Sequence, residues 1–123
     1  MILGIGIDIV KTSRFQQILL NHPSRFTRLC HRILHKNEQD GLNRENCPQR
    51  LASAWAAKEA LYKSLRDQDQ PNCRFNQWQK IKINGRFEMV CDKQVQGEEF
   101  LLSISHDGDF TTAIVLRQKS TNN

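Results

Sequence analysis

The longest continuous helical pattern in the chain runs from Arg50 to Leu65, with the sequence RLASAWAAKEALYKSL. Its apolar side chains recur at steps of three and four residues, which predicts one broad buried face, and its alanines favour a helix. These apolar residues are Leu51, Trp55, Leu61, Tyr62 and Leu65. Pro48 suits a first turn, and the polar run RDQDQPN after Leu65 predicts the end of the helix. We expect the other elements to pack around this helix.

Glu59 and Lys63 lie four residues apart in this helix, so their side chains share one face. An exposed ion pair with this spacing contributes only about 0.3 to 0.5 kcal/mol, and it would explain the two residues if they stood alone. The motifs that contain Asp8 and His106, described below, favour a role in binding or catalysis for both Glu59 and Lys63.

The chain has 123 residues, enough for one domain, residues 1–123, with its own core. Its formal net charge is +5, and no acidic residue occurs from Ile9 to Asn37. The basic residues of that segment are Lys11, Arg14, Arg25, Arg28, Arg32 and Lys36. A surface this positive attracts phosphates, nucleic acid, anionic membranes or an acidic protein, and charge alone does not choose among them.

The cysteine pattern and the first residues bear on the cellular compartment. Cys30, Cys47, Cys73 and Cys91 form no CxxC pair, so we expect free buried thiols rather than a zinc site. The opening MILGIGIDIV has no basic leader and is too short to span a membrane. We therefore expect an intracellular protein of the cytoplasm or mitochondrial matrix, not secreted and not bound to a membrane.

The segment ILGIGIDIV, residues 2–10, predicts a strand whose glycines allow another backbone to approach closely. Asp8 lies between two isoleucines, and burying its carboxylate costs free energy unless a cation or donors meet it. The alternative is an edge strand that turns Asp8 toward water. A helix through Leu20, capped by Thr12 or Ser13, and a second helix capped by Ser24 should follow.

The C-terminal half predicts strands. Asn84-Gly85 between Trp78–Asn84 and Phe87–Val90 is a strong hairpin signal, and a second hairpin should join Phe100–Ile104 to Phe110–Leu116 with His106 at its tip. The polar residues 117–123 predict a frayed tail. The fold class is therefore α+β, with an antiparallel sheet packed on a long central helix plus short helices.

Three motifs stand in a fixed order: GIGIDIV, WAAKEALYKSL and SISHD. Together they resemble the holo-acyl-carrier-protein synthase branch of the 4′-phosphopantetheinyl transferase superfamily. The resemblance implies this family's fold and a homotrimer with active sites between subunits. The implied activity (EC 2.7.8.7), a step in fatty acid biosynthesis and lipid metabolism, is Mg²⁺-dependent transfer of the 4′-phosphopantetheine group of coenzyme A to a serine of an acyl carrier protein, with release of adenosine 3′,5′-bisphosphate.

The resemblance also implies roles for individual residues. Asp8 and Glu59 would be catalytic and would bind Mg²⁺, which prefers carboxylate and phosphate oxygens. Lys63 would be catalytic and contact the phosphates of coenzyme A, while His106 and Ser105 would bind its nucleotide end. An acid at Glu38 or Asp40 would help a water to deprotonate the serine.

Acyl carrier proteins are acidic, so the resemblance implies that the basic segment between Ile9 and Asn37 binds the carrier. By resemblance Arg14 faces the carrier, and three further arginines would extend that surface. These are Arg25, Arg28 and Arg32.

The chain departs from the family at three places. Ala54 replaces an arginine that contacts a nucleotide phosphate, RDQDQPN replaces a glycine-rich segment, and Lys11 replaces a common acid. These departures suggest a divergent, eukaryotic or mitochondrial member.

Two alternatives from other classes are a small nucleic-acid-binding domain and a noncatalytic carrier-docking module. Trp55 and Trp78 lie in expected core segments, so bases would lack exposed aromatic platforms, and we expect no nucleic-acid partner. His31 and His35 have helical ligand spacing but no third metal ligand nearby.

Overall fold

The computed structural model of the chain describes residues 1–93 and 95–120 and has a five-stranded antiparallel sheet packed against a long helix. The strand order is β1-β5-β4-β3-β2. The strands are β1 (Ile2–Lys11), β2 (Trp78–Ile83), β3 (Arg86–Cys91), β4 (Glu98–Asp107) and β5 (Phe110–Lys119). The helices are α1 (Thr12–Asn21), α2 (Pro23–Ile33) and α3 (Cys47–Ser64), with short 3-10 turns η1 (Lys36–Glu38), η2 (Gln70–Asn72) and η3 (Phe75–Gln77). This arrangement confirms the predicted fold class.

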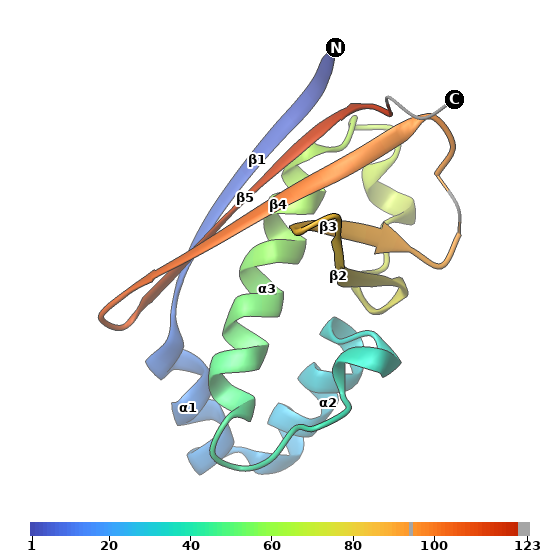
Figure 1. Cartoon of the computed structure of the whole chain (residues 1–123). Helices are drawn as coiled ribbons and strands as arrows, with labels where there is room; N and C mark the ends of the chain where they lie inside the picture. Colours follow the sequence, from blue (N-terminus) through green and yellow to red (C-terminus); the bar gives the residue numbers. More distant parts are fainter. Residues whose placement is uncertain (94, 121–123) are drawn as a thin grey trace.

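The central helix α3 begins three residues before the predicted Arg50, at Cys47, and ends at Ser64, one residue before Leu65. Its core contacts use small residues as well as large ones, because Leu51, Leu61, Ala52, Ala56 and Ala60 are all 0% exposed. Figure 1 shows the helix lying across the sheet, with α1 and α2 gathered at the end where it begins.

Strand β1 lies directly on α3 because two of its residues are glycines. A Cβ atom at Gly6 would lie 1.9 Å from the Ala60 carbonyl oxygen, and one at Gly4 would lie 2.2 Å from the Ser64 carbonyl oxygen. Any side chain at either position would push the strand away from the helix. The predicted close approach is therefore confirmed, and α3 is the partner.

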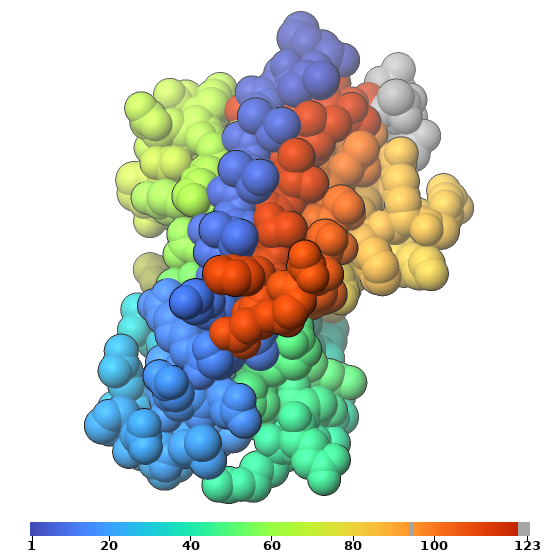
Figure 2. Space-filling model, turned by 90° about the vertical axis from the view of Figure 1, so that its left-hand side faces the viewer, coloured from blue at the N-terminus to red at the C-terminus, as the bar shows by residue number. Residues whose placement is uncertain are grey.

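The alternation along β1 corrects one expectation about Asp8. The strand is indeed an edge strand, but the isoleucines face outward while Asp8 faces α3. Ile5, Ile7 and Ile9 are 58%, 62% and 64% exposed, and the Asp8 side chain is 15% exposed. Figure 2 looks onto the outer face, where β1 runs beside β5. The strand thus presents an apolar face to the outside and its carboxylate to the helix.

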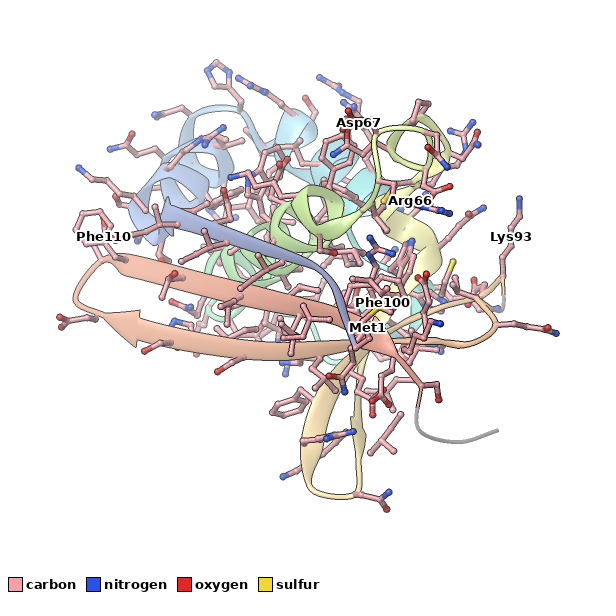
Figure 3. All side chains as sticks on the ribbon, turned by 90° about the horizontal axis from the view of Figure 1, so that it is seen from above. Met1, Arg66, Asp67, Lys93, Phe100 and Phe110 are labelled. Carbon is pink, nitrogen blue, oxygen red and sulfur yellow. The ribbon has the colours of Figure 1, made fainter. Side chains whose placement is uncertain are left out.

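The two predicted hairpins form. The strands of the first end within one residue of the predicted bounds, and those of the second are longer than predicted. Asn84 and Gly85 both have positive φ, as a tight hairpin turn requires. Strand β4 continues through His106 to Asp107, so His106 lies within the strand and not at the tip. Figure 3 shows Phe110, the first residue of β5, at one end of the long strands and Met1 at the other.

The expected frayed tail is also corrected, because β5 continues through residues 117–119. Arg117 is buried there and bonded to three other elements, which a sequence pattern cannot show. Residues 121–123 lie outside the described part of the chain.

The expected helix caps differ as well. Neither Thr12 nor Ser13 caps α1 with its own side chain; instead the Asp109 carboxylate, from the turn between β4 and β5, accepts the Ser13 amide at 2.9 Å and the Ser13 hydroxyl. Helix α2 begins at Pro23, with His22 before it, rather than after a Ser24 cap. In the described part of the chain, no helix combines the length and hydropathy that a membrane span needs.

Candidate functional site

Asp8 and Lys63 meet where the end of α3 crosses β1. The Lys63 ammonium lies 3.2 Å from Asp8 Oδ1 and 3.1 Å from the Ile7 carbonyl oxygen. Lys63 thus pairs with the strand, and this contact takes the place of the simple helical ion pair with Glu59 considered as the alternative. The Asp8 backbone is fixed from the other side, because the Thr112 hydroxyl donates to its carbonyl at 3.0 Å.

The second carboxylate oxygen of Asp8 is buried without a partner. Among residues 1–93 and 95–120, Asp8 Oδ2 is the buried side-chain oxygen or nitrogen for which no hydrogen bond is found. A buried polar atom left unpaired costs about 1 to 3 kcal/mol, so such an atom needs an explanation.

Glu59 completes a pair of acids with Asp8. Burial raises the pKa of the Glu59 carboxyl above its ordinary value, and the Asp8 carboxylate raises it further. Lys63 and Arg14 oppose these shifts without cancelling them. Two carboxylates that repel each other, one with an unpaired oxygen, fit a divalent cation that prefers hard oxygen ligands. In the described part of the chain no three acidic, histidine or cysteine side chains gather to hold a metal, so further ligands would come from substrate or water.

A groove of about 450 Å³ opens beside Glu59 between α2, α3 and the segment around η3. Trp55, Tyr62 and Phe75 line it, and Arg32 of α2 lies on its wall. Arg14 covers the adjacent aromatic surface, with its guanidinium 5.5 Å from the Trp55 ring. The groove therefore joins Glu59 to the basic surface of α1 and α2, where Arg25 and Arg28 are also exposed.

His106 lies elsewhere, in a cavity of about 410 Å³ on another side of α3. Its Nδ1 is 2.9 Å from the Thr111 hydroxyl and 3.2 Å from the amide nitrogen of Gln49, which can only donate. Nδ1 is therefore the acceptor, which places the proton of a neutral ring on Nε2. Ser105 is exposed next to it, and Ala54 lines the same cavity as His106. Within one chain, the structure brings Asp8, Glu59 and Lys63 together but leaves His106 and Ser105 apart from them.

The expected acids Glu38 and Asp40 also line the His106 cavity rather than the groove. Glu38 is engaged: its carboxylate lies 2.5 Å from the Lys58 ammonium and accepts the Lys80 amide at 3.2 Å. Lys58 is 0% exposed and also donates to the Ile33 carbonyl at 2.6 Å. Burial lowers the pKa of Lys58, and the charge of Glu38 opposes that shift.

Sequence reasoning missed the Lys58–Glu38 pair, although a signal was present. Lys58 follows Leu51 by seven residues and precedes Leu61 by three, so helical periodicity places it on the apolar face. A buried ammonium there requires a carboxylate partner.

The other two candidate histidines and the cysteines lie in different environments. His35 is buried, with Nε2 2.8 Å from Asp92 and Nδ1 accepting the Asn37 amide, while His31 is exposed. All four cysteines are free as expected, but Cys47 alone among them is fully buried. Burial raises the pKa of Cys73, beside Glu59 in the groove, to about 11, which makes it a poor nucleophile at neutral pH.

Known proteins resemble this chain in both sequence and overall fold. Residues 4–115 match the model of the 4′-phosphopantetheinyl transferase superfamily. A mitochondrial holo-[acyl-carrier-protein] synthase of Eremothecium gossypii is 30% identical over 135 residues, covering 93% of this chain and 78% of the relative. A holo-[acyl-carrier-protein] synthase of Mycoplasma pneumoniae is 34% identical over 98% of this chain and 97% of its own length. Among solved structures, a holo-(acyl-carrier-protein) synthase of Bacillus anthracis in complex with CoA (3′,5′-ADP) superposes with a TM-score of 0.77 at 28% identity, covering 98% of this chain and 99% of that one.

The raised pKa of Glu59 predicts that this residue costs stability at neutral pH. An acid whose folded-state pKa exceeds its unfolded value of about 4.3 destabilises the fold fully above the folded pKa; the cost shrinks as pH falls through the folded pKa and is gone only below the unfolded value. Glu59→Gln should therefore raise the Tm of the metal-free protein at about pH 7.5, and this gain should shrink steadily as the pH is lowered toward and below about 4.3. Glu45→Gln, at an exposed loop position, is the matched control. A lower Tm for Glu59→Gln at neutral pH would contradict this account.

Proposed function

Because the chain belongs to the 4′-phosphopantetheinyl transferase superfamily, we propose that it transfers the 4′-phosphopantetheine group of coenzyme A to a serine of an apo acyl carrier protein. The observation that carries the proposal is the unpaired Asp8 Oδ2, buried beside the Glu59 carboxylate and the Lys63 ammonium. The names of the bacterial and mitochondrial relatives support the carrier as acceptor, and the Bacillus anthracis complex supports coenzyme A as donor.

Asp8 and Glu59 are the residues that would hold Mg²⁺. When bound there, Mg²⁺ supplies charge neutralisation on the pyrophosphate of coenzyme A. The unpaired oxygen of Asp8 and the raised pKa of Glu59 both reflect negative charge that the protein alone leaves uncompensated.

Lys63 binds the same phosphates and holds them for in-line attack. The serine oxygen forms a bond to the phosphorus that carries the pantetheine arm, and the bond from that phosphorus to the bridging oxygen breaks. Adenosine 3′,5′-bisphosphate leaves with the electron pair, and the serine proton passes to water. The Lys63 ammonium stabilises the charge that develops on the leaving phosphate. The Glu38 carboxylate already accepts from the Lys58 ammonium and the Lys80 amide, so it is less available to activate a water.

His106 and Ser105 serve the nucleotide end of coenzyme A. With Nδ1 accepting from Thr111 and Gln49, His106 can donate from Nε2 to a phosphate oxygen. Ala54 leaves this cavity without the family's arginine, but Arg50 and Lys80 line it as further basic groups.

The carrier docks on the basic surface formed by Arg14, Arg25, Arg28 and Arg32. Arg32 lies in the groove beside Glu59, so this surface leads to one of the two acids of the site. An acidic carrier bound there would present its serine to the phosphates held by Lys63. Charges at such a rim mainly increase the association rate.

The chain assembles as a homotrimer whose active sites lie between subunits. The exposed isoleucines of β1 continue into Ile114, 38% exposed, on the neighbouring strand, and they form an apolar face of the kind that protein interfaces cover. Assembly through this face would bring His106, which does not line the groove beside Glu59 in its own chain, to the acids of another copy.

The proposed activity predicts a mass increase on the carrier. Incubation with Mg²⁺, coenzyme A and apo carrier protein should add one phosphopantetheine arm and release adenosine 3′,5′-bisphosphate, both measured by mass spectrometry. Glu59→Ala should abolish transfer with the fold retained, while Glu45→Ala should not. Full activity of Glu59→Ala, or no added mass with several carriers, would contradict the proposal; carrier binding without transfer would favour a noncatalytic docking module.

The docking surface predicts salt-dependent carrier binding. Joint replacement of Arg28 and Arg32 by alanine should raise KM for the carrier roughly tenfold at low salt with little change in kcat. The difference should shrink as salt screens charges beyond about 8 to 10 Å. The control is Arg86→Ala, on β3. Unchanged kinetics at low salt would exclude this surface.

The assembly predicts complementation between inactive variants. Glu59→Ala and His106→Ala should each be inactive alone, but trimers containing both should regain activity because some sites combine one intact Glu59 with one intact His106. Ile7→Glu should convert the trimer to monomers in sedimentation measurements. A wild-type chain that sediments as a monomer, or mixed trimers that stay inactive, would overturn the assembly.

A further inference from the structure

A buried arginine near the end of β5 joins three elements around the last turn of α3. Arg117 is 4% exposed, and its Nε donates to the Ser64 carbonyl at 2.8 Å. Its Nη2 donates to the Leu3 carbonyl at 2.9 Å, and its Nη1 lies 3.1 Å from the Glu98 carboxylate. We propose that Arg117 is a positioning residue for the transferase site: it holds the last turn of α3 on β1, so that Lys63 reaches Asp8.

The acceptors of Arg117 are groups that regular secondary structure leaves unpaired. Ser64 is the last residue of α3, and the final carbonyls of a helix lack amide partners and attract positive charge. The Leu3 carbonyl lies where the register between β1 and β5 shifts, between Ile2 and Gly4. A Cβ at Gly4 would come within 3.2 Å of two guanidinium nitrogens, so the glycine also makes room for the arginine.

Lys63 depends on this turn because it directly precedes Ser64. Its side chain is 51% exposed, and its ammonium is placed by the bonds to Ile7 and Asp8. Helix ends fray unless their carbonyls are satisfied, and a frayed last turn would release Lys63 while leaving Glu59, one turn earlier, in place. Loss of Arg117 should therefore affect Lys63 selectively.

A guanidinium suits this position better than an ammonium or an apolar side chain. Its planar fork donates in fixed directions, here to α3, β1 and β4 at once, whereas a lysine ammonium acts as a point charge. Replacement of a buried ion pair by apolar side chains of similar volume is often neutral for stability. Loss of Arg117 alone would instead leave the Glu98 carboxylate and two backbone carbonyls without their donor, so its effect on orientation has to be read from Lys63 and from the last turn of α3 rather than from stability.

This inference rests on the proposed transfer, and a double-mutant cycle tests it. Arg117→Met should lower kcat/KM for coenzyme A about 10- to 100-fold, the cost of displacing a catalytic group by about 1 Å, with KM for the carrier unchanged. Arg117→Met should cost nothing further in a Lys63→Ala background, because both changes remove the same interaction. Arg86→Met is the control, since Arg86 Nη2 also approaches a carboxylate, that of Glu99 at 3.6 Å, but on the surface. Equal losses with and without Lys63 would overturn the proposal.

Amide hydrogen exchange provides a readout that does not need activity. Arg117→Met should speed exchange in residues 61–65 relative to the start of α3, and Arg86→Met should not. Should Arg117→Met fail to fold, Glu98→Gln, which keeps the two backbone contacts of Arg117, should give a smaller change in the same direction. If the wild-type protein is inactive, the proposed transfer is refuted, but hydrogen exchange still tests the role of Arg117. If Arg117→Met leaves exchange in the last turn of α3 unchanged, the role of Arg117 is refuted.

Discussion

The contact of β1 with α3 without intervening side chains is the constraint on which the site depends. Gly4 and Gly6 allow the strand backbone to rest on the carbonyls of Ser64 and Ala60. Asp8 follows two residues later on the same face, so it arrives over the last turns of the helix, where Lys63 and Glu59 lie. A strand held at the usual distance from a helix would carry its carboxylate too far away for a direct bond to Lys63.

Close packing at this point brings together charges that the protein alone leaves incompletely balanced. Asp8 raises the pKa of Glu59, Lys63 offsets part of that repulsion, and Asp8 Oδ2 stays without a partner. The buried charge of Lys58, in contrast, is paired: its ammonium donates to the Glu38 carboxylate and to the Ile33 carbonyl. Incomplete balance at one buried site and full pairing at another is the pattern expected when the first site is completed by a ligand.

The sequence was sufficient for features that depend on neighbours along the chain. Helical periodicity located α3, and Asn84-Gly85 located a hairpin. Motif resemblance selected Asp8, Glu59 and Lys63, which the structure brings together and whose catalytic roles stay a prediction. The sequence was insufficient where distant segments meet. The cap of α1 by Asp109, the position of His106 within β4 and the burial of Arg117 all depend on contacts between residues far apart in sequence. The direction of the Asp8 side chain was harder to predict. Alternation along the strand directs either Asp8 or the isoleucines toward the core, and only the contact of the glycines with α3 shows that it is Asp8.

The same alternation couples the two faces of β1. Successive side chains of a strand point to opposite sides, so the register that directs Asp8 toward Lys63 also directs Ile5, Ile7 and Ile9 outward. A shift of one residue would bury the isoleucines against α3 and expose the carboxylate, destroying the acid pair and the apolar face together. The apolar outer face and the contact of Asp8 with Lys63 therefore rest on one register, which the pairing of β1 with β5 and the bonds of Arg117 both fix at the end where the strand begins.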